Sequence, residues 1–409
     1  MGRIFSNTEI ARKTFFFDNW RCFCSGFMDS LTESLALVMA IRVFQAPNWV
    51  KSFIFASSFV GNFFTVITQS LATRQRRYGT MDFSTIHWFI VSFLVFASIW
   101  ATSAVSFLFL ISFAIIFSKQ PIPLMEDVYG QNYSPQERGS RLAITLNLLL
   151  LSTMVFGQVG GKLMDLNLQN YRLALLLVSL AAIGTALSFS RIPSRVLPVE
   201  GKKSMASSVK IIFTDKQFGM ALLWWSLSGI GIQMMGPLRT EYLMDNTWGI
   251  GASNTFVVLV SITIPVGFRI LSTFVCGQIF HRFNFIAIKL MVNLFLMASV
   301  LLFFNTKTKF LVALASACTG IARGGGEIIW CLWVTKIVPK EKFSLYMGLN
   351  VAVTGLRGLL SPFLGYGICQ YLSLAQMSYF SATLVLISSF GFFSLIKHPR
   401  FATISPENS

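Results

Sequence analysis

Two carboxylates one helical turn apart are the first residues of the sequence whose spacing suits proton chemistry. Asp29 and Glu33 lie four positions apart in an apolar stretch, which places both on one face of a helix. Two carboxylates this close in a medium of low dielectric constant cannot both ionise cheaply, so the pair is suited to binding a proton. We therefore predict a proton-coupling site. In the alternative interpretation, both groups are solvated near the end of the helix or neutralised by Arg21 or Arg42.

An internal repeat relates a second set of candidates. A shift of 204 positions, from 135 to 339, superimposes similar residues of the two halves: Pro135, Glu137, Arg138 and Ser140 fall over Pro339, Glu341, Lys342 and Ser344. The same shift places Lys119 over Arg323 and Asp29 over Gln233. Two similar halves with the same orientation favour a shared site between them.

The repeat predicts that Lys119 and Arg323 face each other and bind an anionic group of a solute. Arginine binds a carboxylate or phosphate in a bidentate manner, and lysine attracts it as a point charge. Gln233 is the third predicted solute ligand. The alternatives are internal partners, which are Glu327 for Arg323, Glu33, Glu126 or Asp127 for Lys119, and a neighbouring helix for Gln233.

Other ionisable residues in apolar stretches are candidates because they cost several kcal/mol in hydrocarbon unless they are paired or hydrated. We predict a proton-coupling role for Glu327. Arg269 and Arg357, which lie close to glycines, are predicted gating residues, with structural pairing as the alternative. Three successive glycines at 324–326 predict a bend in their helix, with close helix packing as the alternative.

The composition indicates the environment of these residues. Of the 409 residues, 54% are hydrophobic, only 12% are charged and 41 are Phe, which excludes a soluble or a disordered protein. The net charge of +17 does not indicate a nucleic-acid partner, because the basic residues lie mostly in short clusters between apolar stretches. The three His and six Cys lack metal-ligand spacing and no phosphate-binding loop occurs, so we expect no enzyme activity, metal or cofactor.

We therefore predict an all-α polytopic membrane protein with twelve spans, each near the length of about 20 residues that crosses a bilayer. The predicted spans are 20–43, 50–72, 83–101, 104–127, 141–162, 171–190, 218–242, 254–279, 285–304, 310–334, 344–370 and 376–396. The third and fourth are divided near Ala101–Ser103, because together they are too long for one crossing.

The distribution of the basic residues predicts the orientation. With the N-terminus inside, most of the 33 Lys and Arg residues lie on the inner side, so both termini are predicted to be cytoplasmic and the protein to lie in the cell (inner) membrane. The hydrophilic stretch 191–216 follows six spans and precedes six more. It divides the chain into two predicted bundles, 1–190 and 217–409, joined by a cytoplasmic linker.

This organisation resembles the major facilitator superfamily of secondary transporters over nearly the whole chain. The stretch from Gly277 to Arg282 is similar to the cytoplasmic G-x-x-x-D-R signature of that family, with His281 in place of the acid. The segment with Pro135, Arg138 and Gly139 is similar to the family's P-x-x-x-R-G segment, with one residue fewer between Pro and Arg. The resemblance implies two pseudo-symmetric six-helix bundles, a cavity lined by spans one, four, seven and ten, and gating roles for Arg282 and Arg138.

We predict an alternating-access carrier that moves a small polar or anionic solute together with protons. One alternative is an efflux antiporter for drugs or metabolites, although Gln158 replaces the proline of the antiporter pattern in span five. A second is a membrane scaffold or assembly factor that has the fold without carrying a solute. The predicted partners are the solute, protons and the lipid bilayer, and the predicted state is a monomer.

Overall fold

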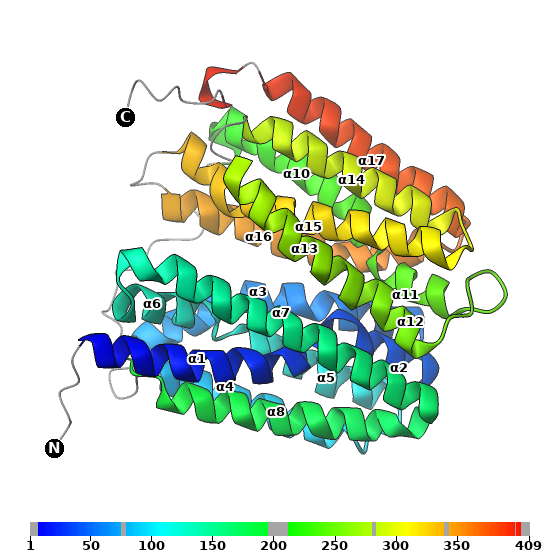
Figure 1. The fold of residues 1–409 in the computed structure, drawn as a ribbon. Helices are drawn as coiled ribbons and strands as arrows, with labels where there is room; N and C mark the ends of the chain where they lie inside the picture. Colours follow the sequence, from blue (N-terminus) through cyan, green and yellow to red (C-terminus); the bar gives the residue numbers. More distant parts are fainter. Residues whose placement is uncertain are drawn as a thin grey trace. The chain divides into compact units, whose positions relative to one another are not determined.

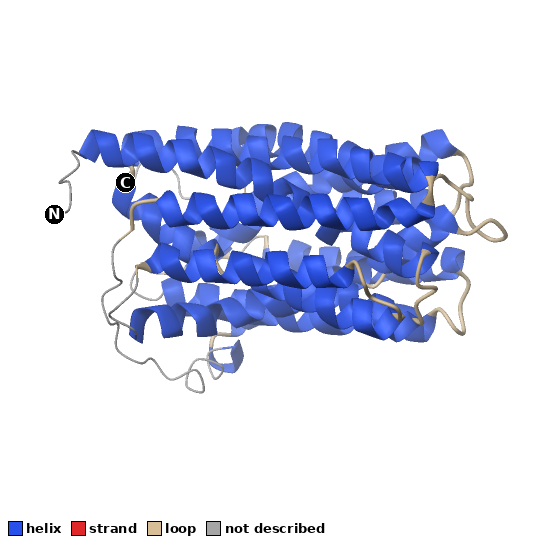
Figure 2. Cartoon of the chain, turned by 90° about the horizontal axis from the view of Figure 1, so that it is seen from below, coloured by secondary structure: helices blue, strands red, loops and turns tan. Residues whose placement is uncertain are grey.

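The structure is a computed structural model that describes residues 7–74, 79–194, 212–279, 284–338, 343–396 and 398–401. These residues form helices, turns and loops, and the described part contains no strand (Figure 2). The chain divides into two compact units. Unit 1 contains residues 1–202 and 253–258, and unit 2 contains residues 203–252 and 259–409.

Unit 1 consists of long helices that pack side by side (Figure 1). They are α1 (Asn7–Ser30), α2 (Ala36–Arg42), α3 (Asn48–Arg74), α4 (Thr80–Ser98), α5 (Ala104–Lys119), α6 (Ile122–Asn132), α7 (Pro135–Leu166) and α8 (Tyr171–Arg191), with the short α12 (Asn254–Val258). A π-helical turn, η1 (Leu31–Leu35), joins α1 to α2. Helix α1 packs between α7 and α8, which contact each other little.

Unit 2 has a similar construction. Its helices are α10 (Lys216–Gln233), α11 (Gly236–Met244), α13 (Ile264–Ile279), α14 (Phe285–Phe304), α15 (Lys309–Ile337), α16 (Phe343–Ile368) and α17 (Leu374–Leu395). A second π-helical turn, η3 (Leu259–Thr263), precedes α13. The core contains stacked aromatic rings, with Phe218 and Trp225 on either side of Trp333.

Local sequence explains where several of these helices begin. Ser103 and Ser373 accept hydrogen bonds from backbone N–H groups in the first turns of α5 and α17, and Asp215 does the same for α10. Proline, which lacks an N–H group, lies in the first turn of α6 and of α11. The runs α5–α6 and α10–α11 are therefore interrupted near their middles.

The outer faces of the helices are apolar. Phe93, Phe274 and Phe390 are each about two-thirds exposed, at 68%, 70% and 67%. Ten helical stretches among the described residues are long and apolar enough to cross a membrane. Each predicted span overlaps a helix, but α3 and α15 are not among these ten, so the count of twelve stays a prediction.

Two of the sequence expectations about helix geometry can be compared directly with the structure. The division between the third and fourth spans is confirmed, because α4 ends at Ser98 and α5 begins at Ala104. The first predicted span begins at residue 20, and its helix extends further towards the N-terminus. Helix α1 begins at Asn7, because the basic residues of its first turns do not prevent a helix from extending beyond the apolar stretch.

The glycines at 324–326 lie inside α15, which is one continuous helix, and two of them lie very close to neighbouring helices. A Cβ atom at Gly324 would lie 2.6 Å from the carbonyl oxygen of Arg269 on α13. One at Gly325 would lie 3.0 Å from Val292 on α14. These distances support the alternative interpretation, close packing of helices, and the bend stays a prediction.

Candidate functional site

In unit 1 the structure pairs two of the predicted site residues, Asp29 and Lys119. The Nζ atom of Lys119, the last residue of α5, lies 3.3 Å from Oδ1 of Asp29 on α1. The side chains are 20% and 31% exposed, respectively, so both are partly withdrawn from the surface. The cation that neutralises Asp29 is therefore Lys119, and Arg21 pairs elsewhere.

Glu33 lies in the π-helical turn that follows Asp29. The turn spans Leu31–Leu35, and the Glu33 side chain is exposed. The same-face argument for Asp29 and Glu33 used regular α-helical spacing, which this wider turn changes. Isolated π-helical turns are rare and occur frequently at functional sites.

A second polar cluster in unit 1 was missed by the sequence analysis. The Asp18 side chain is fully buried, and its two oxygens accept hydrogen bonds from Arg21 Nε at 2.7 Å and from the Tyr129 hydroxyl at 2.9 Å. These contacts connect α1 to α6. Because the first span was predicted to begin at residue 20, Asp18 was not included among the charged residues of the spans.

In unit 2 the structure pairs a predicted gating residue with a predicted proton-coupling residue. The guanidinium group of Arg269 on α13 donates two hydrogen bonds to the Glu327 carboxylate on α15, at 3.0 and 2.9 Å. Arg323 lies one turn before Glu327 on the same helix, and its side chain is exposed. The bidentate geometry fixes α13 relative to α15 through two parallel bonds.

Arg239 on α11 is a further cation that the sequence analysis missed. Its guanidinium group donates to the hydroxyls of Thr319 at 2.7 Å and Ser299 at 2.9 Å, and lies 5.1 Å from the centre of the Phe303 ring. Thr319 is one turn before Arg323 on α15, so Arg323 is a second cation of this region. Arg239 lies within the predicted span 218–242, so the rule applied to other intramembrane charges identifies it too.

Two more cations of unit 2 lie around Trp225. Arg357, a predicted gating residue, donates to the Trp225 carbonyl oxygen at 2.6 Å. Lys289, which the sequence analysis missed, is only 4% exposed, and its Nζ atom lies 4.5 Å from the centre of the Trp225 ring and 3.4 Å from Ser228 Oγ. The Trp225 ring stabilises the Lys289 ammonium group without neutralising its charge, whereas Arg357 contacts the backbone oxygen of Trp225.

The remaining predicted site residues have simpler surroundings. Gln233 ends α10, and its buried Oε1 has no hydrogen-bond partner among the described residues. Arg138 on α7 donates to the carbonyl oxygen of Gly130 at 3.1 Å. Arg282 lies outside the described residues. In the described ranges, no group of three or more His, Cys, Asp or Glu side chains is arranged to hold a metal ion.

No family model matches the sequence, and no curated protein is significantly similar to it. Solved structures are informative about the fold. A variant of the nucleoside transporter NupG covers 95% of this chain and all of its own with a TM-score of 0.77 at 13% identity. A bacterial homologue of the human lysosomal transporter Spinster, inward-facing and occupied, covers 98% of each chain with a TM-score of 0.68 at 12% identity.

The chain has the major facilitator fold. These two similar structures confirm the predicted fold class, and together with the apolar helices they identify a multi-pass integral membrane protein. Identities of 12% and 13% establish the fold alone. The function of this chain must therefore be argued from its own side chains.

Proposed function

We propose that this protein is a secondary transporter that carries a small, polar, anionic solute by alternating access and couples its movement to protons. The two similar structures are transporters by name, which agrees with a carrier. NupG is named for nucleosides. The charges inside this chain favour a different solute class.

The observation that carries the anionic preference is the environment of Arg239. Its two described hydrogen bonds go to hydroxyl groups, which leave its positive charge in place, and Arg323 adds a second positive charge nearby. Two guanidinium groups in the same region, of which that of Arg239 is partly buried, attract a carboxylate or phosphate and can bind it in a bidentate manner. Arg239 and Arg323 are therefore the proposed anion ligands in unit 2, and the free Oε1 of Gln233 is a proposed acceptor for a solute donor group.

Proton coupling is proposed for the two ion pairs. Protonation of Asp29 would remove the negative charge that holds Lys119 and free the ammonium group for the solute. Protonation of Glu327 would release Arg269 in the same way. In both cases protonation of the carboxylate breaks the ion pair, and the released cation can then bind the anionic solute. Proton binding and solute binding are therefore coupled through the same cation.

A ligand screen followed by a flux measurement tests this proposal. The purified chain is screened by thermal unfolding against classes of carboxylates, phosphates, nucleosides and amines at two pH values, because a ligand of the folded state raises its apparent stability. We expect an anionic class to give the largest shift, and Arg239→Gln and Arg323→Gln to abolish it. Arg172→Gln, which changes an exposed cation of α8, is the matched control. A shift given by neutral or cationic compounds alone would contradict the anionic preference.

The same preparation separates the two alternatives. In proteoliposomes with an imposed pH gradient, a symporter accumulates the stabilising solute, whereas an efflux antiporter expels it against entering protons. A scaffold binds no solute class and shows no flux. In that case Asp29→Asn and Arg323→Gln variants remain fully active in the host.

A further inference from the structure

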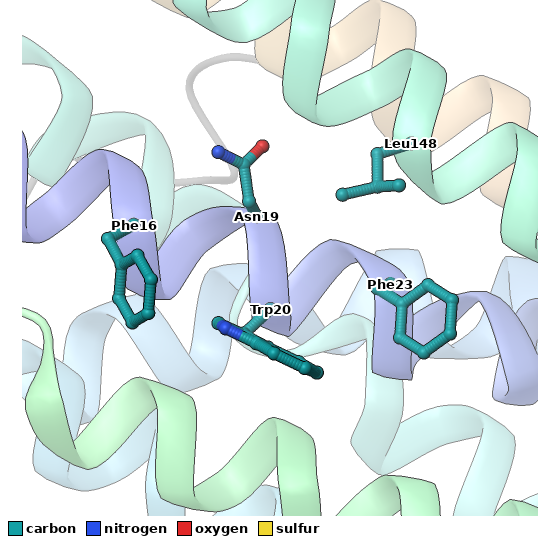
Figure 3. A pocket seen from close by; sticks show the side chains of 5 residues that line it. All are labelled: Phe16, Asn19, Trp20, Phe23 and Leu148. Carbon is teal, nitrogen blue, oxygen red and sulfur yellow. The ribbon is translucent and has the colours of Figure 1, made fainter.

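The outward face of α1 in unit 1 contains a hollow that the proposed transport cycle does not use. Phe16, Asn19, Trp20 and Phe23 of α1 and Leu148 of α7 line it, and its volume is about 260 Å³ (Figure 3). The three aromatic side chains are 56%, 52% and 41% exposed in that order. The hollow is therefore an open, aromatic depression in the surface of the unit.

Helical spacing shows that this face points away from the interior of the unit. Phe16, Trp20 and Phe23 repeat at intervals of four and three residues along one side of α1. Asp18 and Cys22 on the opposite side are buried, and Asp18 contacts Tyr129 of α6. In Figure 1, α1 lies between α7 and α8, which leaves its outer side uncovered within the unit. For a helix in a bilayer, a side that its own bundle leaves uncovered is available to lipid.

Two cations lie at the end of the hollow that is nearer the N-terminus. Arg12 is exposed one turn before Phe16 on the same side of α1. Arg141 of α7 donates to the carbonyl oxygen of Ala11 at 2.9 Å, and its guanidinium carbon lies 5.4 Å from the centre of the Phe15 ring. Glu137 pairs with Arg141 at 3.0 Å and offsets part of the positive charge, so Arg12 is the principal cation.

We propose that this hollow binds an anionic phospholipid, with an acyl chain on the aromatic rings and the phosphate at Arg12 and Arg141. A zwitterionic lipid gains the same apolar contact but carries no net charge for the two guanidinium groups. Arginine is suited to a phosphate because its planar fork donates two parallel hydrogen bonds. The proposal rests on the membrane location of α1 and is independent of solute transport.

Fluorescence quenching by brominated acyl chains tests the proposal on the full chain in mixed micelles. The signal of Trp20 is the difference between the native chain and Trp20→Phe. We expect brominated phosphatidylglycerol to quench this signal at a lower mole fraction than brominated phosphatidylcholine. Arg12→Gln should weaken the phosphatidylglycerol effect about fivefold, the contribution expected for one cation near a lipid surface. Arg172→Gln on α8 is the control and should change nothing.

Two further measurements distinguish binding of a whole phospholipid from binding of phosphate alone. Inorganic phosphate should not displace the brominated lipid, because it lacks the acyl chain that fills the hollow. If Trp20→Phe does not fold, native mass spectrometry of the Arg12→Gln variant replaces the difference signal, and fewer retained phosphatidylglycerol molecules than in the native chain are expected. Equal quenching by the two lipids, displacement by phosphate, or unchanged lipid retention in Arg12→Gln would overturn the proposal.

Discussion

The carboxylate of Asp215, at the start of α10, has well-defined hydrogen-bond partners, so a substitution of this residue has a predictable effect on the stability of unit 2. Its carboxylate receives two hydrogen bonds from Arg400, at 2.6 and 2.8 Å, and one from the Tyr346 hydroxyl at 2.8 Å. It also accepts the backbone N–H of Phe218 at 3.2 Å. Arg400 in turn donates to the carbonyl oxygen of Ile337 at 2.8 Å. The cluster connects α10, α15 and α16 to the segment after α17.

The Asp215→Asn variant isolates the charge of this cluster. Asparagine keeps an oxygen for the Phe218 N–H and removes the ion pair with Arg400. The paired side chains are 14% and 27% exposed, so solvent screens the pair only in part. Charge-assisted hydrogen bonds are worth about 1.5–3 kcal/mol. We expect a loss of about 2 kcal/mol, equivalent to roughly 4–8 °C in Tm for a unit of this size. Asp215→Ala should cost about 1 kcal/mol more, because the helix cap is lost as well.

The pH dependence of this effect has a definite sign. Burial by itself would raise the pKa of Asp215, but the hydrogen bonds from Arg400, Tyr346 and the Phe218 N–H, with the charge of Arg400, lower it below the ordinary value of 3.8. A depressed pKa contributes stability above the unfolded value, and this contribution is lost as the pH falls through the folded value. The Tm difference between native chain and Asp215→Asn should therefore be full at pH 6 and shrink below about pH 4.

Thermal unfolding in detergent at several pH values measures this difference. A double-mutant cycle with Arg400→Gln gives the coupling between the two side chains. A coupling of zero, or a Tm difference that persists unchanged to pH 3, would refute the reasoning.

Three further predictions concern charges and packing inside the helices. Lys289→Met should raise Tm, because an apolar side chain of similar length replaces a buried ammonium group that has no carboxylate partner among the described residues. A lower Tm would show that the charge stabilises the fold. Gly324→Ala should cost about 1–3 kcal/mol, since its Cβ would lie 2.6 Å from a carbonyl oxygen, whereas Gly348→Ala, with open space, should be close to neutral in the same unfolding assay. Asp29→Asn should destabilise unit 1, because it leaves the Lys119 ammonium group without its partner. Adding Lys119→Met removes that group and should restore most of the lost Tm. If Tm does not recover in the double variant, loss of the ion pair is not the cause of the destabilisation.

The sequence predicted the general architecture well, because the bilayer imposes a length and an apolar composition on every spanning helix. The break between Ser98 and Ala104 followed from this constraint alone. The constraint is weaker at helix ends that extend into water. Helix α1 therefore begins before the predicted span 20–43, and the buried Asp18, which lies outside that span, was overlooked.

The pairing of charged residues was less predictable than their positions. Asp29 and Lys119 are 90 positions apart, and Arg269 and Glu327 are 58 apart. Periodicity within one helix does not determine which helices become neighbours. The sequence therefore suggested several partners for Lys119, and the one observed was not among them. The contact of Lys289 with the Trp225 ring, 64 positions away in the sequence, was likewise not predictable from periodicity.

The central claim is that the intramembrane charges couple a solute to protons, and proton flux tests it most directly. Proteoliposomes that contain a pH-sensitive dye are supplied with the anionic compounds that stabilise the purified chain, without an electrical potential. The account predicts solute-dependent proton entry with the native chain, its loss in Asp29→Asn, and unchanged entry in the control Arg172→Gln. Solute uptake without proton movement, or undiminished proton entry in Asp29→Asn, would contradict it.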